Sequence, residues 1–208
     1  KRHNKTVVIL PNYPRLSIFS KIRRKKDIFS SDKVRLIYVG NISEDRGLFR
    51  MLEMVRDLHA AMNVQLILIG KFVSSDVERR FRETLDMHCL ESRVHYIGYL
   101  SHEETVKHLM DADIGLFLLN GRERFRWGEP IKYFEYSLSG LPVIISVFPA
   151  KRALIEKNKK ILGQLIVGSK SENAFDQIDK IYLLEIAETF AERYNEEEIK
   201  EVNHHTGR

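Results

Sequence analysis

Short apolar runs alternate along the chain with longer amphipathic stretches. Six runs have the length and composition of buried strands, at 34–39, 64–69, 94–97, 114–119, 143–146 and 165–167. The stretches between and after them predict helices at 47–62, 75–89, 101–111, 130–138, 151–158 and 171–203. Strands that alternate with helices favour right-handed crossovers and a parallel sheet covered on both faces. We therefore expect an α/β fold, a Rossmann-like doubly wound parallel sheet of about six strands.

Two serine-led sequences indicate where helices begin. Residues 75–78 (SDVE) and 101–104 (SHEE) both have the spacing of a capping box, in which a serine and a glutamate satisfy each other's backbone N–H groups. The helix after Pro130 is expected to bury a face made of Ile131, Phe134 and Leu138, which recur at helical spacing.

An unusual charge pattern marks the loop 120–130 and the start of the helix after it. Four cations lie before or within the first turn: Arg122, Arg124, Arg126 and Lys132. A helix N-terminus already has a partial positive charge, so cations there are unfavourable unless an anion lies between them. A phosphate is the usual anion at such a position. The alternative is that the arginines are solvated and pair with Glu123 and Glu129.

Fold-level reasoning selects the same loop. In the doubly wound strand order the first and fourth strands are neighbours, and ligands bind beyond their carboxyl ends. The loops at that point are 40–46 and 120–130, and Arg46 stands at the start of the following helix. The sequence therefore predicts a phosphate-bearing ligand between two helix N-termini.

Glu135 lies three residues after Lys132, so the two side chains share a helix face. A phosphate would repel this carboxylate unless it has another task. Accepting hydrogen bonds from a ribose diol is such a task, as in dinucleotide-binding folds. The alternative is a surface pair with Lys132, which contributes little to stability.

Other site chemistries find little support. Asp111 and Asp113 superficially match a metal-binding acidic motif, but they lie where a helix runs into a buried strand, and we interpret them as structural. No histidine spacing suggests zinc. Gly40-Asn41-Ile42 is not the GxGxxG fingerprint, which disfavours a nicotinamide dinucleotide. We expect neither a metal nor a cofactor.

The overall composition is that of a soluble globular protein, with a net charge of +5 over 208 residues. The densest basic cluster, at 21–26, could bind nucleic acid or an anionic membrane, but aromatic residues do not interleave it, and we expect no nucleic-acid partner. The single cysteine, Cys89, fits a reducing compartment. We expect a cytoplasmic protein, with peripheral association at the cytoplasmic face of the membrane left open.

Several segments together carry a family resemblance. They are VILPNYP (8–14), VGNISEDRG (39–47), LIG (68–70), VHYIGYL (94–100), ADIGL (112–116) and PIKYFEYSLSGLPVI (130–144). With these segments the chain resembles the C-terminal, donor-binding half of a GT-B glycosyltransferase of the family 4, or glycosyl transferases group 1, type. The likeness extends over nearly the whole chain in the order of the family.

The resemblance implies a nucleotide-diphosphate sugar, UDP- or GDP-linked, as donor, and a saccharide or lipid-linked acceptor. It implies a retaining enzyme that needs no divalent metal. Arg46 and Lys132 match residues that stabilise the leaving diphosphate, Glu135 matches the ribose-binding glutamate, and Tyr99 lies by the base. The full set of implied substrate-binding residues is Gly40, Asn41, Arg46, Gly47, Tyr99, Arg126, Pro130, Ile131, Lys132 and Glu135.

Two positions depart from the family pattern. Trp127 stands where many members have the first glutamate of an E-x7-E pair, although some relatives have the shorter Pro-x-Lys-x-x-Glu form that this chain matches. Asn41 stands where many members have an arginine. Both leave the identity of the sugar open.

The resemblance also predicts how the chain is divided. Residues 1–32 would be the crossover from an acceptor-binding domain and a basic connector, 33–170 the nucleotide-sugar-binding domain, and 171–208 helices that cross back toward the other domain. Because the residues before Val7 could not form an acceptor-binding domain, we expect the chain alone to bind nucleotide-sugar weakly and to transfer nothing. Three alternatives remain: a sugar-nucleotide epimerase of the same fold, a non-catalytic nucleotide-binding module, and a basic nucleic-acid binder.

Overall fold

A parallel sheet forms the centre of the protein in the computed structural model, which describes residues 14–22, 31–60, 62–119, 131–145 and 166–167. Within these residues the sheet has the strand order β3-β2-β1-β4-β5-β6. The strands are β1 (Lys33–Val39), β2 (Asn63–Ile69), β3 (Val94–Gly98), β4 (Ile114–Phe117), β5 (Val143–Ile145) and the two-residue edge strand β6 (Ile166–Val167). This confirms the expected doubly wound α/β fold.

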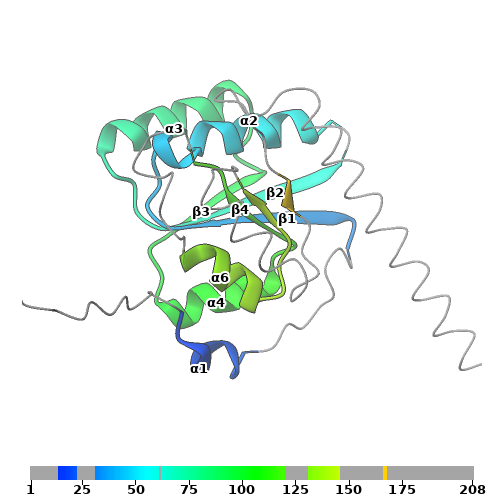
Figure 1. Ribbon diagram of the computed structural model, residues 1–208. Helices are drawn as coiled ribbons and strands as arrows, with labels where there is room; N and C mark the ends of the chain where they lie inside the picture. The colour runs from blue at the N-terminus through cyan, green and yellow to red at the C-terminus, as the bar shows by residue number, and fades with distance from the viewer. Residues whose placement is uncertain (1–13, 23–30, 61, 120–130, 146–165, 168–208) are drawn as a thin grey trace, which may run out of the picture.

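Helices cover both faces of the sheet (Figure 1). α2 (Leu48–Leu58) and α3 (Ser75–Met87) lie on one face, and α1 (Leu16–Phe19), α4 (His102–Asp111) and α6 (Ile131–Leu138) lie on the other. A short 3-10 helix, η1 (Glu44–Arg46), connects β1 to α2. The predicted helices at 151–158 and 171–203 lie outside the described residues.

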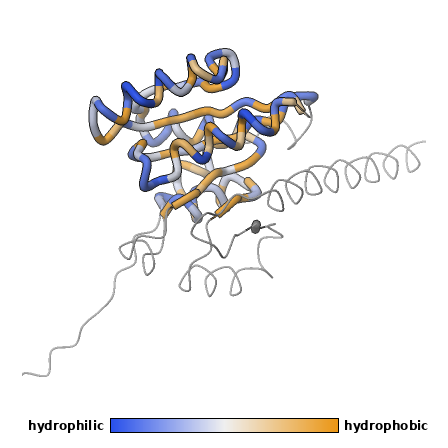
Figure 2. Tube along the Cα trace, turned by 90° about the horizontal axis from the view of Figure 1, so that it is seen from above, coloured by the Kyte–Doolittle hydropathy of each residue, from blue (hydrophilic) through white to orange (hydrophobic). Residues whose placement is uncertain are grey.

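The strands are apolar on both sides because each side faces a separate core. In β1, Leu36 and Tyr38 pack with α2 and α3, while Ile37 packs with α4 and α6. All three are at most 2% exposed. Figure 2 shows hydrophobic residues along the strands, with hydrophilic residues recurring along the helices around them. Near-continuous apolar strands are the expected pattern for a parallel sheet between two helical layers.

One predicted capping box is confirmed and the other is wrong by one residue. Ser101 accepts a hydrogen bond from the Glu104 N–H, and the Glu104 carboxylate accepts one from the Ser101 N–H. At α3 the cap is Ser74, whose hydroxyl accepts from the N–H of Val77. Both serines can cap a helix, but Ser75 is already the first helical residue, so the cap lies one residue before the predicted box.

The predicted apolar face of α6 is only partly correct. Phe134 packs against the core, but Leu138 is 39% exposed, and the fully buried residues are Tyr133 and Tyr136, at 1% and 0% exposure. A tyrosine ring buries as much apolar surface as other aromatic side chains, provided its hydroxyl finds partners. Spacing that counted only aliphatic residues and Phe134 therefore missed the two residues that fill the core.

The sheet opens between β1 and β4, at the predicted switch point. The two strands pair only at Leu36 with Ile114 and Ile37 with Gly115, and β1 runs on to Val39 beside β2. At the other end of the pair, Arg35 donates to Asp113 Oδ2 from its backbone N–H at 2.7 Å and from Nε at 3.2 Å. Asp113 is fully buried in this contact, which confirms that it is structural.

Candidate functional site

A pocket of about 270 Å³ opens beyond the carboxyl ends of β1, β2 and β3. Its lining residues come from the three strand ends and from α4: Val39, Gly40, Asn41, Ile69, Gly70, Lys71, Tyr99, Leu100 and Thr105. Gly40, Asn41 and Tyr99 belong to the predicted substrate-binding set. The pocket therefore lies where ligands of doubly wound sheets bind.

Lys132, the second residue of α6, reaches across to the end of β1. A Cβ atom on Gly40 would collide with Cε and Nζ of Lys132, so the ammonium group occupies the space that the glycine leaves free. The φ angle of Gly40 is +132°, a conformation that residues with a side chain rarely adopt. The sequence thus places the lysine against the backbone at the edge of the pocket.

The charges around Lys132 come from the other two predicted site residues. Burial lowers the pKa of Lys132, the Glu135 carboxylate raises it, and the Arg46 guanidinium lowers it. Glu135 and Arg46 are therefore both within electrostatic reach of Lys132. Two cations at the same end of the sheet would attract an anionic ligand.

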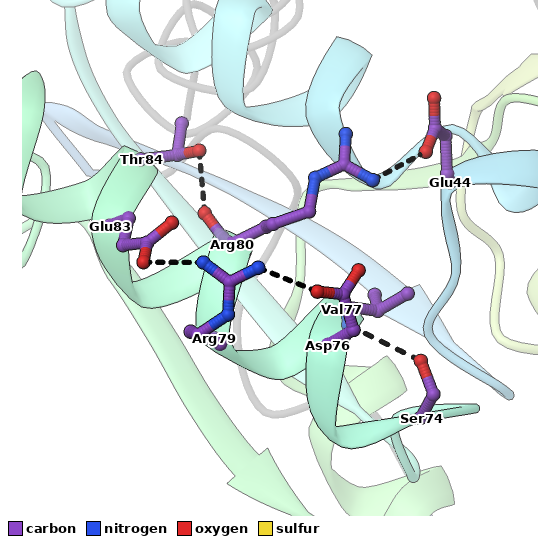
Figure 3. A network of polar contacts seen from close by, with 8 residues as sticks. All are labelled: Glu44, Ser74, Asp76, Val77, Arg79, Arg80, Glu83 and Thr84. Atoms are coloured by element: carbon purple, nitrogen blue, oxygen red, sulfur yellow. Dashed lines mark hydrogen bonds and ion pairs between the residues drawn. The ribbon is translucent and has the colours of Figure 1, made fainter.

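Arg46 is held at this end by the end of β1 and by α3. Burial raises the pKa of Tyr38 to about 12, while Arg46 lowers it through its charge and a hydrogen bond to the side chain. The Tyr38 hydroxyl also donates to the Asn41 carbonyl at 2.7 Å. On α3, Arg80 donates to Glu44 of the same short helix at 2.9 Å (Figure 3). These contacts fix the turn that presents Arg46.

Gly47 allows this turn to approach β4. Its φ angle is +80°, and a Cβ atom there would collide with the backbone carbonyl of Leu118. Any other residue would push η1 and the start of α2 away from the end of β4. Gly47 is therefore required for close backbone packing at this end of the sheet.

Tyr136 closes the gap where β1 and β4 separate. Its hydroxyl accepts a hydrogen bond from the N–H of Val39 and donates one to the carbonyl of Leu116, both at 3.2 Å. Its ring packs where a side chain on Gly115 would otherwise lie. Burial raises the pKa of Tyr136 well above its ordinary value, although the bond from Val39 lowers it. The tyrosine therefore connects β1 and β4 through a side chain of α6.

Glu135 faces α4. Its Oε1 lies 3.1 Å from Nε2 of His102, the first residue of that helix, and the glutamate side chain is 14% exposed. On the far side of the pocket, the ring of Tyr99 is exposed, and Nζ of Lys71 lies 5.0 Å from its centroid. An exposed aromatic ring with a cation on one face leaves its other surface available for stacking.

The structure brings most of the predicted site residues to one end of the sheet. Gly40, Arg46, Lys132 and Glu135 form one group, Asn41 and Tyr99 line the pocket, and Gly47 and Ile131 begin the two helices. The predictions for Arg126 and Pro130, and the departure at Trp127, lie outside the described residues.

Sequence reasoning missed four residues of this region: Tyr38, Lys71, His102 and Tyr136. Tyr136 directly follows Glu135 in the motif, and this position could have suggested a role for it. His102 is the second residue of a capping box, and the serine and the glutamate of that box were sufficient to account for its sequence. Its contact with Glu135 joins residues 33 positions apart, which no local periodicity reports.

The described residues contain no group of three or more His, Cys, Asp or Glu side chains that could hold a metal ion. Among the helices that the structure describes, none is both long and apolar enough to cross a membrane.

The model of the family described as "Glycosyl transferases group 1" matches residues 19–200 of the chain. No curated protein matches the chain significantly. The family match includes every predicted site residue.

Solved glycosyltransferases have a similar fold. HepE of Anabaena, in complex with UDP and glucose, superimposes with a TM-score of 0.57 at 16% identity over 82% of this chain and 44% of its own. TarM of Staphylococcus aureus gives a TM-score of 0.62 at 13% identity, over 90% of this chain and 34% of its own.

A third structure is itself a single domain. The C-terminal domain of the group 1 family protein LpcC from Francisella tularensis gives a TM-score of 0.57 at 17% identity, over 85% of this chain and 84% of that domain. The chain thus spans less than half of HepE and TarM but most of an isolated C-terminal domain.

Proposed function

The chain belongs to the glycosyl transferases group 1 family, and we propose that it binds the nucleoside diphosphate of a sugar donor at the carboxyl ends of β1 and β4. The observation that supports this most directly is the position of Lys132. Its ammonium lies against Gly40 at the edge of the pocket, within electrostatic reach of Arg46 and Glu135. We assign the two cations to the diphosphate, Glu135 to the ribose and Tyr99 to the base.

In this proposal the cations also serve the transfer step. When the bond between sugar and diphosphate breaks, negative charge develops on the departing phosphate oxygen. Fixed positive groups stabilise that charge without needing to reorganise. Arg46 and Lys132 would supply them, so the proposed transfer does not depend on a divalent metal. From the resemblance to the family we further propose that the full-length protein transfers a hexose with retention. The acceptor would be a saccharide or a lipid-linked molecule.

The first test is a calorimetric titration of the chain with UDP, GDP and ADP. The solved HepE complexes contain UDP and UDP-glucose, which makes UDP the first nucleotide to try. Arg46→Ala and Glu135→Ala should each weaken binding by about 10- to 100-fold, because a hydrogen bond to a charged group contributes about 1.5–3 kcal/mol.

Matched controls are available on α3. Arg82→Ala and Glu83→Ala remove the same types of charge from exposed positions that form ion pairs within the helix. Both should bind nucleotide as the wild-type chain does. If none of the three nucleotides binds, the site assignment is wrong. It is also wrong if the Arg46→Ala and Glu135→Ala variants both bind nucleotide as tightly as the wild-type chain.

A further inference from the structure

His102 has an unusual environment for the first residue of a helix. Its Nε2 atom is buried, and among the described residues it has no hydrogen-bond partner at proper angles. Yet the same atom lies 3.1 Å from Oε1 of Glu135. A buried polar atom that lacks a hydrogen bond is costly, so its position needs an explanation.

The chemistry of the contact determines which ring nitrogen has the proton. An ionised carboxylate only accepts hydrogen bonds, and an unprotonated Nε2 would only accept as well. Two acceptors do not approach to 3.1 Å favourably, so Nε2 must be the nitrogen with the N–H. The imidazole then places its N–H donor beside one oxygen of Glu135.

The imidazole is itself held from two sides. The capping box of Ser101 and Glu104 fixes the backbone on which His102 stands. The ring of Phe19, in α1, meets the imidazole edge to face, with centroids 5.9 Å apart and planes inclined by 73°. Phe19 is 7% exposed, so the contact belongs to the core between α1 and α4. A side chain fixed in this way can impose an orientation on its neighbour.

We propose that His102 is a positioning residue that orients the Glu135 carboxylate toward the ribose hydroxyls of the bound nucleotide. The inference rests on the proposed function. His102 engages Oε1, so Oε2 and the remaining lone pairs stay available to the sugar.

A positioning role for His102 makes a prediction that a merely structural role does not. If His102 acts through Glu135, its loss weakens recognition of the ribose hydroxyl and leaves recognition of the diphosphate intact. The test compares the nucleoside diphosphate that binds best among UDP, GDP and ADP with its 2′-deoxy analogue, on the full 208-residue chain. The wild-type chain should prefer the ribonucleotide by about 10- to 100-fold, the value of one hydrogen bond to a charged group.

Three variants measure the effect of His102 on that preference. His102→Ala should weaken binding of the ribonucleotide and leave the 2′-deoxy analogue within about 3-fold, inside the usual scatter of contact energies. His102→Gln should restore much of the preference, because its amide N–H₂ can donate from nearly the position of Nε2. His95→Ala removes an exposed histidine on β3 and should change nothing.

The outcomes separate this inference from the proposed function. If the wild-type chain binds no nucleoside diphosphate, the proposed function fails. If it binds and prefers ribose, and His102→Ala keeps the full preference, only the role of His102 is refuted. A loss of affinity that is equal for both nucleotides, and that glutamine does not restore, would assign His102 a structural role and overturn the inference. Retained binding of the 2′-deoxy analogue demonstrates that the variant is folded.

Discussion

In the proposed function, Lys132 serves binding at the expense of stability. Because burial lowers its pKa, the charged form is less favourable in the folded chain than in the unfolded one. The unfolded state then binds more protons between the lowered pKa and the ordinary value of 10.5, so stability rises with pH across that window. Below the lowered pKa the unfavourable contribution is fully present.

We therefore predict that Lys132→Met stabilises the chain at pH 7 while weakening UDP binding by about 10- to 100-fold, the effect of losing a hydrogen bond to a charged group. The stability gain should shrink as the pH approaches 10.5. Urea denaturation at pH 7 and pH 10, with calorimetry at pH 7, measures both effects. Lys107→Met, at an exposed position on α4, is the control. A variant that is less stable at pH 7 and still binds UDP would contradict the prediction.

Gly40 provides a second residue-level prediction, since its substitution acts on the backbone and on Lys132 together. Gly40→Ala should destabilise the chain by about 1–3 kcal/mol through its positive φ. It should also abolish most UDP affinity, because the new methyl group displaces the ammonium. Chemical denaturation and nucleotide titration measure the two effects.

The matched control for that variant is Gly140→Ala. Gly140 also has a positive φ, of +67°, but a Cβ there meets no atom of the described residues within 4 Å. It should therefore lose stability and keep its nucleotide affinity. If both variants bound equally well, the contact between Gly40 and Lys132 would have no part in binding.

At the scale of single residues, the sequence pointed to candidate site residues that belong to a local sequence pattern. Lys132 and Glu135 share a helix face, and Arg46 directly precedes a glycine and a helix. It could not predict Tyr38 or His102, because their roles depend on contacts made after the chain folds. A tyrosine in an apolar strand and a histidine in a capping box are each consistent with ordinary structure.

At the scale of elements, the strands were predictable because each is a continuous apolar run between two helical layers. The helices were predicted less accurately where polar and aromatic residues decide the outcome. Ser74 rather than Ser75 caps α3, and two tyrosines rather than Leu138 fill the space beneath α6. Tyr136 could be placed only by tertiary structure, since its hydroxyl bonds Val39, which is 97 positions away.

The connection that Tyr136 makes between β1 and β4 leads to a prediction about α6. Tyr136→Phe should lower the free energy of unfolding by about 1–3 kcal/mol, because the buried N–H of Val39 loses its acceptor. Urea denaturation followed by circular dichroism measures the change. Tyr99→Phe removes an exposed hydroxyl and should have no effect on stability. Equal stability of the two variants would show that the Tyr136 bridge contributes little.

At the scale of the whole molecule, the topology explains why separate segments form one site. β1 and β4 are neighbours at the centre of the sheet, although the helices and strands from α2 to α4 lie between them in the chain. The carboxyl ends of both strands therefore lie side by side. The alternation of strands and helices in the sequence was sufficient to predict this meeting point, but not which side chains would contact each other across it.

Hydrogen exchange tests the location of the site in the whole chain. Amides that exchange by local opening are slowed by a ligand only where the opening would break the ligand's contacts. With saturating UDP we predict slower exchange in residues 40–48 and in α6, and unchanged local exchange in the outer turns of α3. The α3 amides report on the same sheet without touching the proposed site, so they serve as an internal reference. Protection confined to α3, or to the edge strand β3, would place the nucleotide elsewhere and would separate the cluster of Arg46, Lys132 and Glu135 from its binding.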